Sequence, residues 1–362
     1  MGEFVYRNYN VIVGKRKDVT VGVQAINPLT NLPFVIQHIG PGGNSSGAPD
    51  DPWGSIADAQ TAGGDVIVVH AGTVLTESII LQDGDVIIGQ GGGIQEYLNI
   101  KGYGAVAVPK VGTATDVPII QGVDGNEVTM ANNSVFAGFI IDTPTGHGIF
   151  ANGVHDSLVS NVSIRDAGGD GVLLQNTTSS FHLGGVEISD AAGAGLHVSG
   201  GSADVSYTGR IETSTGRSIL IADTTDGLVS LAGTTVVDDG GDGVQLLDND
   251  GDIVLSNLTV KNTSGVGVEI RGGAGHVALL SDTRITDAGG TGLLIADREG
   301  NTLVNKAEIE AADGEHGIEL SNNDGETWFN AVDVEAENGT AIYARDSERF
   351  SIAGGEVNSD GG

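Results

Sequence analysis

Gly243-Val244-Gln245-Leu246 is followed 24 residues later by Gly267-Val268-Glu269-Ile270, and this repetition decides the fold. The same unit, a small residue followed by apolar, variable and apolar positions, recurs through the C-terminal two thirds of the chain. Its first residue is called the marker position below. The markers are Gly148, Gly171, Gly195, Ser218, Gly243, Gly267, Gly292, Gly317 and Ala341. A steady period of this length indicates stacked supersecondary units rather than a compact globule.

The positions around each marker predict three short strands per repeat. Alternation of apolar and variable residues after the marker is the two-residue period of a strand with one buried face. A second apolar position lies seven residues before most markers, as at Ile164, and a third lies about twelve residues before, as at Val159 and Leu280. Ser206 interrupts this third column. Neither the spacing of amphipathic helices nor the hexapeptide repeat typical of left-handed β-helices is seen. We therefore predict an all-β fold, a right-handed parallel β-helix with about 24 residues per coil.

Three regions are expected along the chain. Residues 1–39 form an N-terminal strand and linker region, residues 40–63 a loop and a capping helix, and residues 64–362 the β-helix. A solenoid needs a cover over its open end, and the helix is expected within residues 52–63. Its apolar face would comprise Trp53, Ile56 and Ala59.

The composition limits the function classes. The chain has 48 acidic and 16 basic residues, a net charge of −32, which argues against nucleic acid and against a bare anionic polymer as ligand. Such a charge suits solubility, dissolved cations or salty water. The 59 glycines are interpreted as turn residues, and no cysteine is present to form a disulfide. No apolar run reaches the ~20 residues that a membrane span needs.

Two segments resemble known families. The run Pro52–Ala59, followed by Gly64–Val69 and Gly72, resembles the opening of pectin-lyase-like right-handed β-helix proteins, in which a capping helix precedes a strand of the form Gly-Asp-x-Ile-x-Val-x-x-Gly. The resemblance covers residues 40–362 and implies the fold. The superfamily contains lyases, hydrolases, epimerases, phage tailspikes and adhesive passengers, so the function stays open.

The second resemblance lies in residues 4–24. Phe4–Gly14, with Lys15–Asp18 after it, looks like the last strand of the barrels that carry β-helical passengers in inverse-autotransporter-like surface proteins of marine bacteria. This resemblance implies a secreted or cell-surface protein of a Gram-negative outer membrane, in a marine or salt-adapted bacterium. The alternative is an N-terminal strand that pairs along the helix.

No catalytic residue is predicted. Gly146-His147-Gly148 resembles the histidine motif of polygalacturonase-type hydrolases, but position 147 is a variable position of the repeat, and the Asn-Thr-Asp of that family is missing. The Asp-Pro-His-Glu of alginate epimerases and the Arg-x-Pro-x-x-Arg of pectate lyases are also missing.

Two sets of acids are candidate binding residues. Five residues before four of the markers, an acidic corner is expected, with Thr213 and Asn262 in the coils between; Asp suits a turn there and could also bind cations. Its members are Asp166, Asp190, Asp238 and Asp287. A D-x-D-G-x segment resembles half of an EF-hand loop and gives three candidate Ca²⁺ ligands. These are Asp248, Asp250 and Asp252.

Aromatic side chains offer a further hypothesis. Tyr207, Trp328, Tyr343 and Phe350 could form a carbohydrate platform, whereas Phe329 falls in a core column.

Three functions remain open from the sequence. The regular coils and the missing catalytic signatures favour a non-catalytic passenger or stalk at the cell surface, structural or adhesive, with a polysaccharide or another surface molecule as partner. The alternatives are a polysaccharide-active enzyme, either a lyase or a glycoside hydrolase, and a phage-tailspike-like fibre domain, which would be trimeric.

Overall fold

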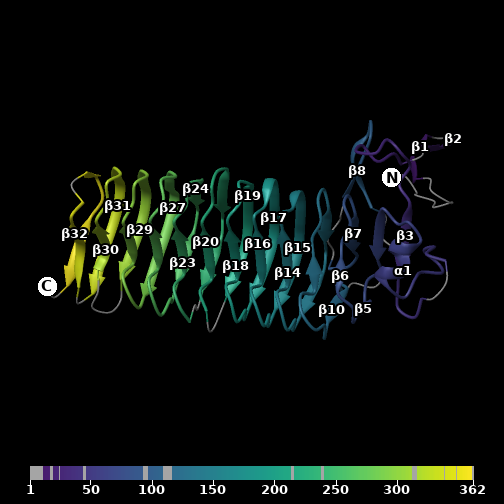
Figure 1. The fold of residues 1–362 in the computed structure, drawn as a ribbon, viewed down its shortest axis with the longest axis horizontal. Helices are drawn as coiled ribbons and strands as arrows, with labels where there is room; N and C mark the ends of the chain where they lie inside the picture. Colours follow the sequence, from purple (N-terminus) through teal and green to yellow (C-terminus); the bar gives the residue numbers. More distant parts are fainter. Residues whose placement is uncertain are drawn as a thin grey trace.

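The computed structural model describes residues 11–16, 19–23, 25–43, 46–92, 97–108, 116–212, 216–237, 240–311, 316–337, 339–347 and 349–360. The chain winds into a rod of stacked coils, with the N-terminal elements at one end and the C-terminus at the other (Figure 1). The predicted fold class is confirmed: this is an all-β parallel solenoid of about eleven turns and about 24 residues per turn.

One wall of the solenoid is a sheet of eleven short strands, with parallel pairing between neighbouring coils. Each coil contributes one strand, which begins directly after the marker position in the coils of Gly148 to Gly292 and one residue before it in the last two coils. In chain order the strands are β6 (Ile79–Ile80), β11 (Val128–Thr129), β14 (Ile149–Asn152), β16 (Val172–Gln175), β18 (Leu196–Ser199), β20 (Ile219–Ala222), β23 (Val244–Leu247), β26 (Val268–Arg271), β28 (Leu293–Ala296), β30 (His316–Ser321) and β32 (Thr340–Arg345).

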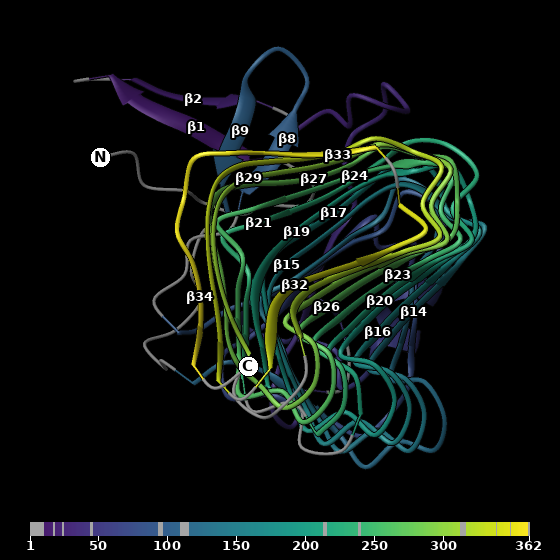
Figure 2. The same ribbon diagram turned by 90° about the vertical axis from the view of Figure 1, so that its left-hand side faces the viewer.

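A second, larger sheet of nineteen described strands forms the rest of the wall. Several of its strands bend at a corner of the coil, so the sheet covers more than one side in the view along the stack (Figure 2). Its strands are β3 (Ile36–Ile39), β4 (Val66–Val69), β5 (Val74–Leu75), β7 (Val86–Gly89), β10 (Ile119–Gln121), β12 (Val135–Ala137), β13 (Ile140–Asp142), β15 (His155–Arg165), β17 (Thr178–Ser189), β19 (Asp204–Glu212), β21 (Leu228–Ala232), β22 (Thr235–Val237), β24 (Asp252–Ser256), β25 (Thr259–Lys261), β27 (Val277–Ala288), β29 (Thr302–Ala311), β31 (Thr327–Glu337), β33 (Phe350–Ala353) and β34 (Val357–Asp360).

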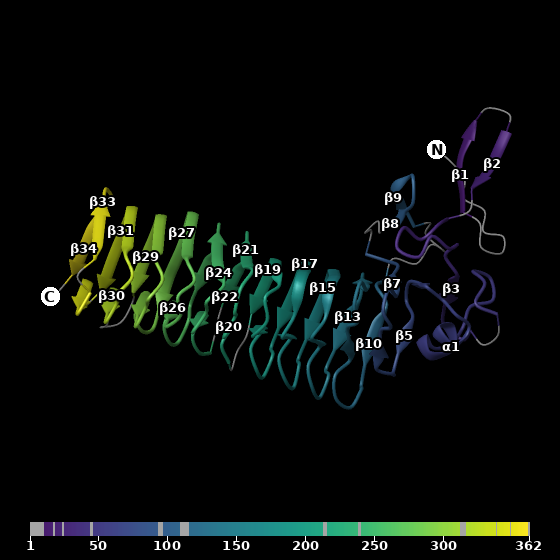
Figure 3. The ribbon, with the colours of Figure 1, turned by 45° about the horizontal axis from the view of Figure 1, so that its top comes forward.

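A short helix and two hairpins complete the N-terminal end (Figure 3). The capping helix α1 (Ile56–Thr61) begins at Ser55, whose hydroxyl accepts a hydrogen bond from the amide of Asp58, a standard N-cap contact. Its residues Ile56 and Ala59 are buried in the main core. The helix therefore covers the first coil, as the sequence predicts.

The solenoid sheet begins earlier than the boundary at residue 64 suggests. Strand β3 pairs in parallel with β4, so part of the region 1–39 already belongs to the first coil. Strands β1 (Val11–Arg16) and β2 (Val19–Val23) form an antiparallel hairpin with each other. The barrel-strand resemblance falls partly on residues 4–10, 17, 18 and 24, which lie outside the described residues.

The second hairpin, β8 (Tyr97–Ile100) and β9 (Gly104–Ala107), covers the outer face of the first coils. Leu98 and Ile100 are buried there against Val66, Val68 and Ile88. Val68 and Ile88 do not contribute to the main core cluster, because this hairpin gives them a separate small core. The first coils are therefore apolar on both faces.

The apolar columns form one continuous interior core, as predicted. From the coil of Gly148 to that of Gly317, the residues one and three positions after each marker are at most 1% exposed. Two assignments in the third column were wrong. Leu279 rather than Leu280 fills the column, since the additional residues Ser281 and Asp282 form the corner after it.

Tyr207, expected on the surface, is fully buried in the same column. It aligns with Leu183 and Leu231 on the neighbouring coils, while Ser206 faces outward. Its hydroxyl donates a hydrogen bond to the carbonyl of Val186 at 2.7 Å, so the phenol is satisfied inside the core. Burial raises the pKa of Tyr207, and the phenol stays neutral.

At the marker glycines, the interior side chains leave no room for a Cβ atom. At Gly195 a Cβ atom would lie 2.4 Å from Cγ2 of Ile211 and 2.8 Å from the carbonyl oxygen of Ser218. The other marker glycines meet a β-branched side chain at 2.4–2.7 Å in the same way, and none of them has a positive φ. Most of these glycines lie at a bend before a strand, but it is the lack of space for a Cβ atom and not a left-handed backbone that requires glycine there.

True left-handed corners are formed mainly by Asn and Asp. The residue five positions after the marker has a positive φ in most coils, a conformation in which these two side chains are better tolerated than other non-glycine residues. This corner comprises Gly153, Asn176, Gly200, Asp223, Asp248, Gly272, Asp297, Asn322 and Asp346.

Adding one methyl group at a marker tests the packing account. We expect Gly195→Ala to destabilise the protein by ~1–3 kcal/mol, because the Cβ overpacks against Ile211 and the next coil. The matched control is Gly184→Ala, where a Cβ would meet nothing within 4 Å and φ is not left-handed. Thermal unfolding of both variants checks this, and equal melting temperatures would contradict it.

Glu127 gives a second prediction, because it occupies the place of a marker glycine. Val128 pairs with Ile149 on the next coil, so Glu127 occupies the position equivalent to Gly148. The side chain of Glu127 is fully buried. Neither carboxyl oxygen has a hydrogen-bond partner of good geometry. Burial and the nearby Asp142 carboxylate raise the pKa of Glu127 from 4.5 to about 8, although the amides of Val123 and Asp142 favour the charged form in part.

The neutral carboxyl is therefore the form that the fold prefers. The free energy of unfolding should fall as the pH rises from 4.5 to about 8, because over this range the unfolded chain releases a proton that the folded state still holds. Glu127→Gln should remove this loss, so that the stability of the variant relative to the parent rises between pH 4.5 and about 8 and is constant above it. Denaturant titrations at several pH values test it, with exposed Glu187→Gln as control. Parallel curves for the parent and Glu127→Gln would refute the assignment.

Candidate functional site

A shallow groove of about 540 Å³ crosses the outer face of the eleven-stranded sheet near the middle of the described rod. Two outward columns supply its side chains: the position just before each marker, and the variable position two residues after it. The groove lies over the coils of β16, β18 and β20. Its lining comprises Asp170, Ala192, Gly193, Ala194, His197, Gly216, Arg217, Leu220, Gly241 and Asp242.

A column of glycines two positions before the markers makes room for these side chains. A Cβ atom at Gly169 would lie 2.8 Å from Nδ1 of His147, and one at Gly193 would lie 2.3 Å from Oδ1 of Asp170. The side chain before one marker can therefore lie across the backbone of the next coil. This arrangement brings polar groups from three successive coils into contact.

Asp170 is the centre of that contact. It is 9% exposed, and its Oδ1 accepts a hydrogen bond from the amide of Ala194 at 2.7 Å. Its Oδ2 lies 3.1 Å from Nδ1 of His197 and 3.5 Å from Nδ1 of His147. The carboxylate thus lies between two imidazoles that come from the coils on either side of it.

The charged form of Asp170 is favoured despite its burial. Burial alone would raise the pKa of Asp170. The net effect is a lowered pKa, because the carboxylate accepts hydrogen bonds from His197 and the Ala194 amide and interacts with the charges of His197 and His147. A fixed carboxylate that accepts from His197 Nδ1 orients the ring and leaves Nε2 directed away from it. This is the arrangement by which an acid positions a histidine for proton transfer.

Arg217 contributes a cation to the groove two coils from Asp170. Its side chain is exposed, and it forms no ion pair with any residue that the structure describes. Leu220 gives the groove an apolar side. An unengaged guanidinium next to a positioned imidazole can bind an anionic group of a ligand.

Beyond Arg217 the same face continues as a hydrogen-bonded polar network. Gln245 donates to Asp242 at 2.7 Å and to Glu269 at 2.8 Å, and Arg271 bonds both Glu269 and Asp297 at 2.9 Å. Asp242 also accepts from the amide of Val266, the same contact that Asp170 makes to Ala194. Arg271 is engaged by two carboxylates of this network, so we place the candidate site at Asp170 and His197, beside Arg217.

The predicted Ca²⁺ residues do not converge. Asp250 accepts from the amide of Ala274 at 3.0 Å, and Asp252 accepts from that of His276 at 2.9 Å, while Asp248 is one of the left-handed corner residues. Within the described ranges, no group of three or more His, Asp or Glu side chains is arranged to hold a metal ion. Calcium binding by Asp248, Asp250 and Asp252 stays a prediction without support from this geometry.

The acidic corner has backbone geometry that suits a turn. Asp166, Asp190 and Asp287 all have positive φ, as does Asn262 at the equivalent place. Asp238 lies outside the described residues. Cation binding at this corner stays a prediction.

The expected aromatic platform is not assembled. Tyr207 and Phe329 are buried, Trp328 lies on β31, and Tyr343 lies on β32 of the other sheet. Phe350 is exposed on β33.

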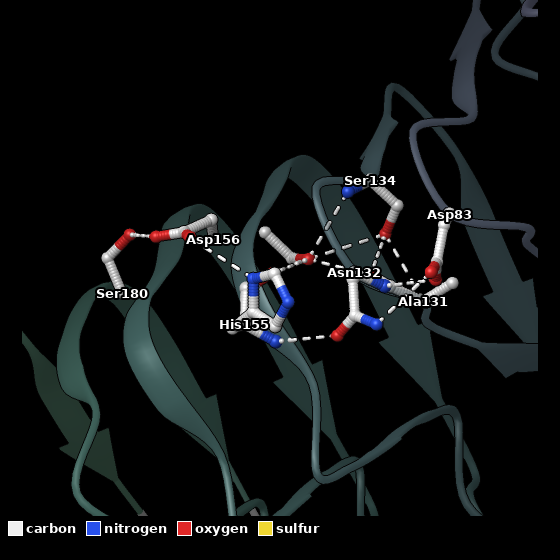
Figure 4. Close-up of polar contacts among 8 residues, drawn as sticks. Asp83, Ala131, Asn132, Ser134, His155, Asp156 and Ser180 are labelled. Carbon is white, nitrogen blue, oxygen red and sulfur yellow. Dashed lines mark hydrogen bonds and ion pairs between the residues drawn. The ribbon is translucent and has the colours of Figure 1, made fainter. Parts of the chain in front are cut away.

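A second histidine cluster lies at a corner of the coils and serves the stacking (Figure 4). His155 Nδ1 lies 3.1 Å from Oδ2 of Asp156, and Ser180 donates to Oδ1 of Asp156 at 3.0 Å. The serine thus bonds the carboxylate rather than the imidazole, so it has no base to activate it as a nucleophile. Asn132 continues the ladder by accepting from the amide of His155 and donating to Asp83.

His197 was missed by the sequence analysis, and His147 was set aside as repeat pattern. Both occupy variable positions, and only their alignment with Asp170 across coils shows a cluster. The signal that could have found it is the second glycine column, at Gly146, Gly169 and Gly193, because glycines there free the space over which a preceding side chain can lie.

The fold defines the class of protein: a right-handed parallel β-helix. The family described as right-handed β-helix region matches residues 119–283. A comparison with curated protein sequences gave no significant match.

Solved structures with similar folds are polysaccharide-acting enzymes by their titles. The A-module of mannuronan C-5 epimerase AlgE4 from Azotobacter vinelandii superposes with a TM-score of 0.58 at 16% identity, covering 83% of this chain and 94% of its own. The AlgE6 A-module of the same organism gives 0.54 at 13%, covering 84% and 93%. The catalytic unit of a GH87 α-1,3-glucanase from Streptomyces thermodiastaticus strain HF3-3 gives 0.51 at 16%, covering 94% and 71%. At these identities the likeness concerns the fold alone.

Replacing the central carboxylate tests its electrostatic role. Because the folded-state pKa of Asp170 is lowered, its stabilisation is present above about pH 4 and is lost as the pH falls through the folded value. We expect Asp170→Asn to be less stable than the parent near neutral pH, with the gap closing in acid. Exposed Asp166→Asn is the matched control, since Asn262 occupies the same corner. A gap that persists unchanged below about pH 2 would contradict the electrostatic assignment.

Proposed function

We propose that this chain is a polysaccharide-active enzyme, and that the groove over β16, β18 and β20 is its active site. The observation that carries the proposal is the Asp170–His197 pair, which lies in the groove with Arg217, a cation that no described residue pairs with. Support also comes from the fold, because the solved structures that superpose best among those named above act on polysaccharides according to their titles.

Among the reactions open to this fold, the groove supports a lyase best. Elimination from a uronate chain needs a base for the proton next to the carboxylate and a cation to stabilise the charge that develops there. His197 Nε2 supplies the base, and the Arg217 guanidinium supplies the cation. The net charge of −32 repels a polyuronate over long range, but salt screens charges beyond about 8 Å, so the local cation at the groove decides the binding.

A glycoside hydrolase at this groove is less well supported. Hydrolases of the common type need two carboxyl groups about 5–9.5 Å apart around the scissile bond. Asp170 and Asp242 line the groove, but they lie three coils apart, roughly 14 Å at the strand spacing of ~4.8 Å. The pair Asp242 and Glu269 lies closer together, yet the carboxamide of Gln245 fills the space between them.

A non-catalytic passenger or stalk is the second candidate. The feature that favours it is the regularity of the repeat, because markers follow each other at 23–25 residues and leave little chain for long active-site loops. The described part of the chain contains no helix long and apolar enough to cross a membrane. We propose a secreted or cell-surface location for either function, and the assays below separate the two.

Loss of the base should abolish turnover of polyuronates. We expect the parent protein to release unsaturated products from a polyuronate, detected as ultraviolet absorbance of the new conjugated double bond. His197→Ala should lower kcat by about 10²–10⁴-fold, the usual contribution of a positioned acid or base. His182→Ala is the control, because His182 lies on β17 of the other sheet and bonds Ser206.

The same assay distinguishes the alternatives. Reducing ends released from a neutral glucan without ultraviolet absorbance would favour a hydrolase. Saturable binding of polysaccharide without any product would favour the passenger.

A further inference from the structure

We propose that the N-terminal end of the rod carries a docking tip, formed by the loop 26–33 and the hairpin turn 100–104, that binds the surface of an anionic lipid bilayer. The inference is independent of the proposed function, because it concerns how the rod is held and not which molecule the groove binds. Two features of this end motivate it: its exposed apolar side chains and its charge.

The loop presents two leucines to solvent. Leu29 and Leu32, at 63% and 64%, are the two most exposed large apolar side chains among the described residues. Both ends of the loop are anchored, because Ala25 and Phe34 are buried in the small core that the β8–β9 hairpin completes. Asn27 closes the loop: its amide donates to the carbonyl of Leu32, and its side chain accepts from the amide of Leu29, both at 2.8 Å. A fixed loop therefore holds the leucines outward.

The turn of the β8–β9 hairpin lies against this loop. The amide of Lys101 donates to the carbonyl of Ile26 at 3.0 Å, and the Lys101 ammonium donates to the side-chain oxygen of Asn31. Tyr103, in the same turn, is 52% exposed. Single exposed apolar side chains are ordinary on a protein surface. Three of them on two segments that are bonded to each other form a patch, which marks an interaction site.

The charge of this end differs from that of the rest of the chain. Residues 19–49 contain no Asp, Glu, Lys or Arg, and residues 97–108 contain Lys101 but no acid. Strand β1 adds Lys15 and Arg16 in its sequence. In a chain with a net charge of −32, this is the part that an anionic surface does not repel. The occupant we assign to the tip is therefore anionic.

A lipid surface fits the side chains of the tip. Leucines on a projecting loop can enter the apolar edge of a bilayer, tyrosine prefers the headgroup level, and lysine keeps its ammonium near the phosphates. Helix α1, whose first turn carries Asp58, lies on the opposite side of the first coils from this hairpin (Figures 1 and 3). Salt screens charges beyond about 8 Å, so the acids of distant coils do not prevent the contact.

Docking at the tip leaves the candidate groove uncovered. In the view along the rod, both N-terminal hairpins project beyond the coils on the side of β24 and β27 (Figure 2). The strands β16 and β20, which carry the groove, lie on another side. A rod held in this way still offers its groove to a sugar chain.

Co-sedimentation with lipid vesicles tests the proposal. We expect the parent protein to bind vesicles of phosphatidylglycerol and phosphatidylcholine in equal parts, more weakly at high salt, and to bind phosphatidylcholine vesicles less tightly. The double variant Leu29→Asn/Leu32→Asn should lower the vesicle affinity at least about tenfold, because two inserted apolar side chains are lost. Its thermal stability should equal that of the parent, since both leucines are exposed.

The matched control is Phe350→Asn/Ile352→Asn, which removes two exposed apolar side chains from β33 at the other end of the rod. This variant should keep the vesicle affinity of the parent. An equal loss of affinity in the control would overturn the assignment to the tip.

The remaining outcomes decide between a bilayer and other occupants. A parent that binds neither kind of vesicle, or a leucine variant that keeps its affinity, would overturn the proposal. Self-association of the parent that the leucine variant abolishes, without vesicle binding, would assign the tip to a contact between copies instead. If the leucine variant does not fold, Tyr103→Trp gives a second measurement. Its emission, compared with that of the parent, should shift to the blue when mixed vesicles are added, and an unchanged emission would overturn the proposal.

Discussion

The strict length of the coil is the constraint on which the rest of this structure depends. Parallel pairing along the sheets places each residue about 4.8 Å from its equivalent in the next coil, so any change in coil length must be absorbed at a corner. The contact between a marker glycine and a β-branched side chain, as between Gly195 and Ile211, shows how little space the interior leaves. Where a coil has an additional residue, as at Ser281 and Asp282, it lies at a bend with left-handed backbone and the core column is preserved.

The same constraint builds the candidate site. Residues 23 to 27 positions apart in the chain, such as His147, Asp170 and His197, come into contact because their positions in the repeat differ by no more than a few residues. Ladders of this kind usually compensate their own charges, as Gln245, Glu269 and Arg271 do farther along the face. The groove differs in that the ladder ends at Arg217, which no described residue pairs with. Asp170 bonds the inner nitrogen of His197, and no residue in the described part of the chain bonds its outer nitrogen. A candidate site of this kind can thus be built in a regular solenoid without long loops.

The sequence predicted the parts of the structure that follow from spacing. The interior columns, the capping helix and the parallel coils depend on periodicity, which a single sequence displays directly. The prediction from spacing was wrong where one residue shifts the register. It placed Leu280 in the core instead of Leu279, and it placed Tyr207 on the surface of the solenoid. It also failed at the site, because the repeat makes His147 and His197 look like ordinary variable positions. Whether a variable side chain meets a partner depends on how it lies across the next coil, which spacing does not reveal.

The most direct test of this account is an NMR titration of the protein with a polyuronate oligosaccharide, observing the imidazole and backbone signals. The account predicts saturable shifts at His147, His197 and the amides of Ala194 and Arg217, with signals from the larger sheet unchanged. Shifts confined to the larger sheet or to the corner at His155, or no shift for any acidic or neutral oligosaccharide, would contradict the claim that the groove over β16, β18 and β20 is where this protein binds sugar chains.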